Sequence, residues 1–483
     1  NKPAAVATGK GSGSAGGKAD KKKGETLEGI TTSKENNFGA WYSEVVVKSE
    51  LIDYYDVSGC YILRPWAYAI WERVQQELDT RIKAMGVQGC YFPMFVSEKA
   101  LNAEQDHVEG FTPEVAWVTR TGTSDLAMPV AIRPTSETVM YPSFKKWIRS
   151  HRDLPLKINQ WCNVVRWEFK NPTPFIRTRE FLWQEGHTAH SSLEESSAEV
   201  QQVLDMYASV YAELLAVPVI KGTKTESEKF AGALYTTTVE AYIPGSGRGI
   251  QAATSHNLGQ NFAKMFNIEY EDQKGAKCTV WQNSWGMTTR SIGIMIMLHG
   301  DNKGLVLPPR VAPIQVVLVP VVSKNCTMTH LREYLRDLEK SLTAKAIRST
   351  LDDAEHQTPG WKYNHWEKKG VPIRVEVGPR DLENGSLRLV RRDNGCKEDV
   401  PAGNAAERIL TLLDEIQRSM LERAEAERDS NIVSVHDWPA FSSAISKKQL
   451  ALAPSCSQAE CEEQVGQRSK TIPTHTHTHT HTH

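Results

Sequence analysis

The sequence lacks the features that mark membrane and secreted proteins. No apolar run approaches the length of a membrane span, and no apolar signal segment opens the chain. Its eight cysteines are scattered, which excludes a small disulfide-stapled fold and is typical of a reducing compartment. Neither sign of charge dominates, since the formal net charge is -1. A neutral sum does not exclude RNA, because RNA binding depends on a local basic face. We therefore expect a cytoplasmic protein with no membrane contact.

The two ends of the chain lack the apolar periodicity of folded elements. Residues 1–30 are rich in Gly, Ala, Ser and Lys, and residues 471–483 end in alternating Thr and His. Such low-complexity composition buries little apolar surface, so we expect a disordered tail at each end. The total of 483 residues leaves room for two or three domains between them.

Two strand-like segments carry the most informative pattern. In the first, Arg166 and Glu168 alternate with three apolar residues, Val165, Trp167 and Phe169, so a strand would have a core face and a charged face. After a proline-containing loop, the second segment has four residues on one face: Phe181, Trp183, Glu185 and His187. Such a hairpin suits a nucleotide, because aromatic faces stack on a base and a guanidinium bridges phosphates. An Arg-x-Glu pair is also often a plain surface ion pair.

The hairpin, WCNVVRWEFKNPTPFIRTREFLWQEGH from residue 161 to 187, closely resembles motif 2 of class II aminoacyl-tRNA synthetases. Its last part, REFLWQEGH, is similar to the version found in prolyl-tRNA synthetases. The resemblance implies that ATP is held by Arg166, Glu168, Arg177 and Phe181.

A helix followed by a strand precedes this hairpin. The helix begins at Pro65 and ends before Gly86, and a strand containing Pro93 is predicted over residues 90–95. The pair resembles motif 1 of class II enzymes, which implies that Pro93 lies at the interface of a homodimer. A buried helix beside an edge strand would look similar.

Residues 131–138 are predicted to open another helix, whose Ser and Thr side chains could simply cap it. The segment resembles the Thr-x-Glu element of prolyl enzymes. The resemblance implies that Thr135 and Glu137 bind the imino group of proline. It also implies a ring pocket and its surroundings formed by Phe111, Glu114, Arg166, Trp183, Glu185, His187 and His256. A secondary ammonium needs a carboxylate, and an apolar ring needs aromatic walls.

Residues 250–256 are predicted to form a strand and a turn into a helix, where Thr254 could cap the helix. The resemblance instead assigns Gln251 and Thr254 to ATP. Relatives often read GGDYTTT and QGGTSH, whereas this chain has Leu234 and two alanines, Ala252 and Ala253. We expect these alanines to stiffen the turn.

Residues 284–293, SWGMTTRSIG, resemble motif 3, a strand that turns into an apolar helix. An arginine entering a buried helix is costly unless it is paired or bound to an anion, so Arg290 is a phosphate candidate. The resemblance places Thr288 and Arg290 at ATP.

Alternating strands and helices follow residue 314 and predict a small mixed α/β layer. It resembles the anticodon-binding domain of several class II synthetases. Acids could accept from guanine edges and basic side chains could hold phosphates; the candidates are Lys369, Arg374, Glu376, Arg380 and Asp381. The alternative is a charge-paired sheet edge.

The segment after residue 431 resembles the start of the C-terminal domain of eukaryotic-type prolyl enzymes. Cys456 and Cys461 match the first half of a cysteine cluster that binds zinc in many relatives, but no second pair follows. We expect a truncated domain without a native zinc site, and no other metal site in the protein.

Together these features predict an α+β protein: a class II antiparallel sheet flanked by helices (residues 31–310), a mixed α/β anticodon-binding domain (311–430) and the truncated segment (431–470). The resemblance implies ligation of L-proline to tRNA(Pro) with ATP and Mg2+, through a prolyl-adenylate, by a homodimer in which Arg166 and Arg290 are catalytic. Two alternatives stay open, a class II synthetase for another amino acid and a non-catalytic RNA-binding paralogue.

Overall fold

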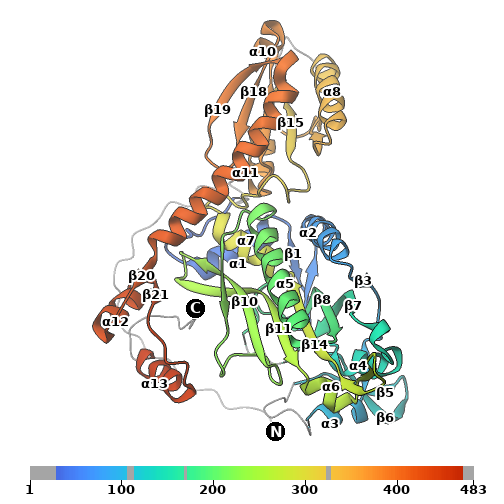
Figure 1. The fold of residues 1–483 in the computed structure, drawn as a ribbon. Helices are drawn as coiled ribbons and strands as arrows, with labels where there is room; N and C mark the ends of the chain where they lie inside the picture. The colour runs from blue at the N-terminus through green and yellow to red at the C-terminus, as the bar shows by residue number, and fades with distance from the viewer. Residues whose placement is uncertain (1–28, 106–113, 168–170, 323–327, 471–483) are drawn as a thin grey trace, which may run out of the picture.

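The computed structural model describes residues 29–105, 114–167, 171–322 and 328–470 (Figure 1). Its centre is a seven-stranded sheet in which neighbouring strands are antiparallel, except for the parallel pair β3–β7. In spatial order the strands are β3 (Gln88–Gly89), β7 (Leu156–Val165), β8 (Glu180–His190), β14 (Trp281–Thr288), β11 (Arg248–Gly259), β10 (Tyr235–Ile243) and β9 (Val219–Thr223).

The largest apolar core joins four helices to this sheet. They are α1 (Phe38–Lys48), α2 (Pro65–Ala84), α5 (Leu193–Glu213) and α7 (Arg290–His299). Buried aromatic side chains, among them Trp71, Tyr207 and Trp285, fill the space between helices and strands. Tyr207 of α5 donates a hydrogen bond to Gln184 Oε1 at 2.8 Å. Because successive residues of a strand point to opposite faces, this contact directs Trp183 and Glu185 to the other face of β8.

Smaller elements surround the sheet. A three-stranded sheet in the order β4-β6-β5 comprises β4 (Phe95–Ser97), β5 (Trp117–Thr121) and β6 (Ser124–Ile132). Two hairpins are β1 (Ile52–Tyr54) with β2 (Tyr61–Leu63), and β12 (Glu269–Glu271) with β13 (Lys277–Thr279). Three further helices lie beside these strands: α3 (Glu98–Gln105), α4 (Glu137–Trp147) and α6 (Asn261–Phe266), with a 3-10 turn at His151–Asp153.

A second, five-stranded sheet lies above the first in Figure 1. Its order is β16-β15-β17-β18-β19, with β15 parallel to both neighbours and the remaining pairs antiparallel. The strands are β15 (Val316–Pro320), β16 (Ser349–Leu351), β17 (Ile373–Val377), β18 (Ser386–Arg391) and β19 (Lys397–Pro401). The helices are α8 (Met328–Ala344), α9 (Pro359–Lys368), α10 (Pro379–Asn384) and α11 (Ala405–Ser430), with a 3-10 turn at Ala402–Asn404.

The chain then returns to the first sheet. Strands β20 (Ile432–Ser434) and β21 (Leu450–Leu452) form a parallel pair, joined through α12 (Trp438–Ser446) and followed by α13 (Ala459–Ser469). Tyr242 of β10 donates to the carbonyl of Lys448, and Ser227 donates to Glu462. No helix among the described residues combines the length and apolarity of a membrane span.

The two large sheets are joined by direct contacts. Arg392, just after β18, makes a bidentate ion pair with Asp301, both distances being 2.7 Å. Trp66 of α2 donates to the carbonyl of Lys369 at 3.2 Å. Gly304 has φ +129, and a Cβ there would lie 2.7 Å from the carbonyl oxygen of Lys368. The close backbone approach at this junction therefore requires glycine.

The predicted α+β architecture is confirmed, but three local predictions are wrong. Residues 90–94 lie outside any strand, because the Phe92 N–H bonds to the Gln160 side chain and the Phe92 carbonyl to Arg133. Strand β7 ends at Val165, and Trp167 is 40% exposed with its N–H bonded to the Glu114 carbonyl. Phe169 lies outside the described residues.

The third wrong prediction is the turn into a helix after residue 250. Thr254 and His256 lie inside β11, which continues to Gly259 and pairs with β10 and β14 on its two sides. A central strand satisfies its backbone groups on both edges, so no helix begins there. The helix α6 starts only at Asn261.

Gly186 provides a test of the packing beneath the sheet. An ideal Cβ at Gly186 would lie 2.2 Å from Cζ2 of the buried Trp285 ring. We expect Gly186→Ala to lower the free energy of unfolding by about 3 kcal/mol or more, because overpacking forces the indole from its site. The measurement is the thermal unfolding midpoint. Gly89→Ala, in the same sheet with nothing within 4 Å of its Cβ position, is the matched control, and equal midpoints for the two variants would contradict the packing described.

Candidate active site

A cavity of about 590 Å3 opens on the face of the central sheet opposite α5. Its floor comes from β8, β11 and β14, and its rim from the segments before α4 and after β7. Most of the predicted site residues that the structure describes line it: Glu114, Thr135, Glu137, Arg166, Arg177, Phe181, Trp183, Glu185, His187, Gln251, Thr254, His256, Thr288 and Arg290. The structure therefore brings together the candidates for both ATP and proline.

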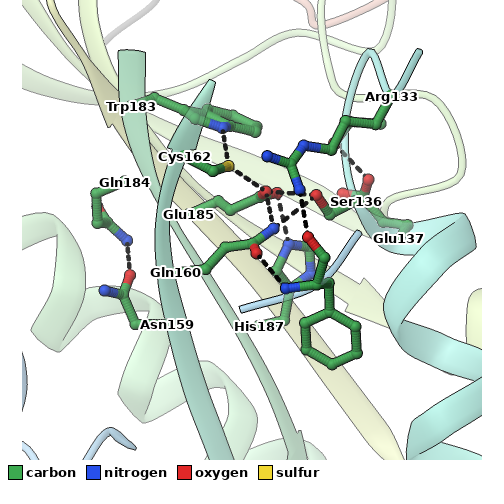
Figure 2. A network of polar contacts seen from close by, with 12 residues as sticks. Arg133, Ser136, Glu137, Asn159, Gln160, Cys162, Trp183, Gln184, Glu185 and His187 are labelled. Carbon is green, nitrogen blue, oxygen red and sulfur yellow. Dashed lines mark hydrogen bonds and ion pairs between the residues drawn. The ribbon is translucent and has the colours of Figure 1, made fainter. Parts of the chain in front are cut away.

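Glu185 is the central acid of the cavity and is 1% exposed. Figure 2 shows donors from several segments converging on its carboxylate. Gln160 and Ser136 donate to Oε1 at 2.6 and 2.5 Å, and His187 Nε2 lies 3.0 Å from Oε2. Burial alone would raise the pKa of Glu185, but His187 and these donors outweigh it and hold the pKa below its usual value. The acid is therefore ionised.

Two histidines in the cavity have opposite pKa shifts. Burial works against the charged form of His187, but the hydrogen bond to Glu185 and the negative charge of Glu137 raise its pKa. For His256, burial together with the positive charges of His187 and Arg166 lowers the pKa to about 3. His256 Nδ1 lies 2.8 Å from Thr236 Oγ1. His256 is consequently neutral at working pH, whereas His187 favours the imidazolium.

An aromatic wall stands beside Arg166. The rings of Phe181 and Trp183 meet edge to face with centroids 5.9 Å apart. The Arg166 guanidinium carbon lies 5.3 and 5.6 Å from the two ring centroids, and Arg166 Nε donates to the Pro134 carbonyl at 2.9 Å. These contacts hold the guanidinium at the cavity wall.

The segment before α4 directs its hydroxyl groups to buried carboxylates rather than to the helix end. Thr135 donates to Glu137, and Ser136 donates to Glu185. Ser136 is the N-cap residue of α4, yet its side chain makes no capping bond. The alternative that these residues only cap the helix is therefore wrong.

Arg290 begins α7 at the far end of the cavity. Its Nε donates to the Ile176 carbonyl at 3.1 Å and its Nη1 to the Gln251 carbonyl at 3.2 Å. Burial lowers the pKa of Arg290, although the group remains a cation at neutral pH. A partly buried arginine that donates to two carbonyls and lies near Arg166 and Arg177 provides a site for an anion.

The comparisons with known proteins agree with this geometry. Residues 121–299 match the tRNA synthetase class II core domain (G, H, P, S and T), and residues 315–412 match the anticodon binding domain. The cytoplasmic proline–tRNA ligase of Arabidopsis thaliana is 57% identical over 95% of this chain and 86% of its own length. The chain belongs to the proline–tRNA ligase family. In the bifunctional glutamate/proline–tRNA ligase of Cricetulus griseus, at 54% identity, the match covers 92% of this chain but 30% of that protein.

A solved relative extends the likeness to the whole fold. The crystal structure of prolyl-tRNA synthetase from Cryptosporidium parvum, complexed with halofuginone and AMPPNP, is 55% identical and superimposes with a TM-score of 0.90 over 93% of this chain and 92% of that chain. The structure of the same enzyme complexed with L-proline and AMP gives a TM-score of 0.88 at 53% identity, over 92% of each chain.

Two predicted residues of the family site, Glu168 and Phe111, lie outside the described residues. Four of the five predicted anticodon residues already have partners within the chain. Lys369 sits at the junction of the sheets, ion-paired with Glu50 at 2.8 Å. Arg374 and Glu376 pair with each other at 2.8 Å, and Asp381 accepts from the Gly378 N–H. These contacts favour the charge-paired alternative for Arg374 and Glu376, while the anticodon roles stay predictions.

The sequence prediction missed several residues that build the site. Arg133, 1% exposed, donates to the carbonyls of Phe92 and Asn163 and supports the rim. Gln160 and Ser136 complete the shell of Glu185. One feature of the sequence could have pointed to them: two adjacent amides, Asn159 and Gln160, stand inside an otherwise strand-like run. Buried amides require hydrogen-bond partners.

Within the described ranges, no group of three or more His, Cys, Asp or Glu side chains is placed to hold a metal ion. Cys456 and Cys461 are exposed free cysteines on the C-terminal segment. The absence of a native zinc site stays a prediction.

The raised pKa of His187 predicts a pH-dependent stability difference. The charged imidazole contributes stability fully below the unfolded pKa of about 6.5, and the contribution is lost as pH rises through the higher folded pKa. We expect His187→Gln to lower the unfolding midpoint most near pH 6, with a smaller difference from wild type at alkaline pH. Thermal unfolding across this range measures it, with the exposed His356→Gln as control. A difference that grows with pH would contradict the assigned charge.

Proposed function

We propose that this chain ligates L-proline to tRNA(Pro) in two steps, with ATP consumed to form a prolyl-adenylate. Proline–tRNA ligases are its relatives over most of its length. The observation that carries the residue assignment is the single cavity in which two cationic side chains, Arg166 and Arg290, adjoin an aromatic and acidic pocket. An amino acid and a nucleotide could therefore bind side by side in this one cavity.

The acidic end of the cavity suits proline. Glu137, 2% exposed, supplies a carboxylate for the secondary ammonium, and Thr135 holds that carboxylate by donating to it. Trp183 offers an apolar face to the ring, and neutral His256 adds a wall without a charge. Glu185 and His187 support this wall from below.

The cationic end suits the phosphates of ATP. The carboxylate of proline attacks the α-phosphorus in line, an oxygen–phosphorus bond forms, and the bond to the bridging oxygen breaks as pyrophosphate leaves. Negative charge grows on the phosphoryl oxygens, where Arg166 and Arg290 stabilise it. Phe181 provides a ring for the adenine, and Arg177, Gln251, Thr254 and Thr288 line the same end.

Mg2+ would enter bound to ATP. Glu228 and Glu240 are carboxylates near this end, and both contact Lys224, at 3.1 and 2.7 Å. Magnesium typically takes one or two protein carboxylates together with substrate phosphates, so these residues fit it. When bound, it would neutralise phosphate charge.

The second step transfers the prolyl group to tRNA. The terminal ribose hydroxyl attacks the carbonyl carbon of the adenylate, and AMP leaves with the bonding electron pair. A larger cavity of about 1940 Å3 adjoins the first and offers room for the end of the tRNA that carries this hydroxyl. It is lined by Arg177, Gln251 and Arg290 on one side and by residues from 428 to 465 on the other. The anticodon binding domain supports tRNA as the substrate, and a cytoplasmic relative supports a cytoplasmic location.

The chain is also proposed to act as a homodimer. Large apolar side chains lie exposed on and near the β4–β6 sheet that follows Pro93: Tyr91 at 71%, Phe95 at 52%, Trp117 at 42% and Met128 at 72%. Exposed apolar groups gathered in one region mark an interaction surface.

The proposed domain boundaries remain residues 31–310 for the catalytic domain, 311–430 for the anticodon-binding domain and 431–470 for the C-terminal segment.

The adenylation site can be tested without tRNA. Proline-dependent exchange of pyrophosphate into ATP should occur with the wild-type protein and not with other amino acids. Arg166→Ala should reduce the exchange rate by roughly 10²–10³-fold, because charge on the phosphoryl group loses its stabilising donor. Arg120→Ala, an exposed arginine paired with Asp125, is the control. No exchange with any amino acid by folded protein would refute the proposed function.

The proposed dimer can be tested by mass measurement in solution. A double variant, Phe95→Glu with Met128→Glu, should shift the mass from two chains to one, since charges buried without partners at an interface are costly. Leu410→Glu alters a similarly exposed apolar residue, 40% exposed, on α11 beside the five-stranded sheet, and should leave the mass unchanged. A wild-type protein of one chain would contradict the proposal.

A further inference from the structure

We infer that Cys162 is a positioning residue for the proposed proline pocket, holding the indole of Trp183 through a hydrogen-bond relay that starts at Glu185. The inference rests on the proposed function, because it assigns Trp183 to the wall that meets the proline ring. It concerns a residue that does not itself line the cavity.

The sheet register places the three groups together. Cys162 of β7 lies directly opposite Trp183 of β8, and Gln160 lies opposite Glu185. Because residues two apart share a face, Cys162, Trp183 and Glu185 point to the same side of the sheet. Figure 2 shows the sulfur between the indole and the carboxylate. Trp183 Nε1 is 3.2 Å from Cys162 Sγ, and Sγ is 3.3 Å from Glu185 Oε1.

The direction of both hydrogen bonds follows from the chemistry of the partners. An indole N–H can only donate, and an ionised carboxylate can only accept. The thiol must therefore accept from Trp183 and donate its own proton to Glu185. Burial, followed by the charge of Glu185, raises the pKa of the Cys162 thiol, which keeps that proton in place. The orientation of the indole is thus tied to the ionised state of the buried acid.

The other contacts of Trp183 leave its orientation dependent on this relay. Gly286 of the neighbouring strand leaves room beneath the ring, since a Cβ there would lie 3.3 Å from Trp183 Cε3. Phe181 meets the indole edge to face, and Arg166 lies over it at 5.6 Å. These contacts involve the faces and edges of the ring and leave the indole N–H to Cys162. The hydrogen bond to Sγ is directional, so it selects the orientation that forms the pocket wall.

The test compares Cys162→Ala and Cys162→Ser in proline-dependent pyrophosphate exchange. Alanine removes both hydrogen bonds, and we expect the KM for proline to rise roughly five- to tenfold, as the loss of about one hydrogen bond implies. The KM for ATP should change less than twofold. Serine, which can accept and donate in the same way, should restore most of the affinity for proline. Cys90→Ala, a half-buried cysteine bonded to the Asn159 carbonyl, is the matched control.

A double-mutant cycle separates this role from general destabilisation. Trp183→Phe keeps an aromatic wall but has no N–H, so Cys162→Ala should raise the KM for proline much less in that background than in the wild type. An equal rise in both backgrounds, an equal rise in the KM values for proline and ATP, or no rescue by serine would overturn the relay. If the wild-type protein shows no proline-dependent exchange, the proposed function fails instead.

Discussion

The buried carboxylate of Glu185 is the constraint on which the site depends. A charge with 1% exposure is costly unless donors surround it. Here Ser136, Gln160, Cys162 and His187 all point at it, from the segment before α4 and from strands β7 and β8. Losing any one donor leaves a buried charge less well compensated, so the network fixes these three segments relative to one another. The network around Glu185 also positions the walls of the pocket, because Thr135 and Glu137 adjoin Ser136 and because Trp183 is bound to Cys162.

The charges around Glu185 also differ from one part of the cavity to another. His187 faces Glu185 and favours its cation, whereas His256 faces a hydroxyl and other cations and is neutral. One residue type thus takes two charge states within a single cavity, because only one of the two rings adjoins a carboxylate. The result is an acidic corner at Glu137 beside a cationic side formed by Arg166 and Arg290. An amino acid zwitterion fits this order, with its ammonium toward the acid and its carboxylate toward the arginines.

Sequence periodicity predicted strands and helices correctly where no tertiary contact competes for their backbone groups. The alternation from Phe181 to His187 predicted a single working face correctly, and Pro65 and Gly86 correctly predicted where α2 begins and ends. Periodicity failed where a tertiary contact took over a backbone group. Trp167 leaves the predicted strand because its N–H binds the Glu114 carbonyl. The shell of Glu185 was not predictable from local pattern, since its donors are far apart in the sequence and only the fold brings Ser136 to Gln160.

Leu234 and the two alanines, Ala252 and Ala253, differ from the expected family pattern without changing the charged centre. The alanines at 252 and 253 would stiffen a turn, but they lie in a central strand, where each is 4% exposed and an alanine meets no conformational penalty. The expectation of a stiffened turn is therefore wrong. Leu234 is 46% exposed beside Gly259 and does not line the cavity. None of these substitutions removes a donor from Glu185 or a cation from the phosphate end. The positions at which the chain departs from the family pattern thus lie outside the charged centre and its donors.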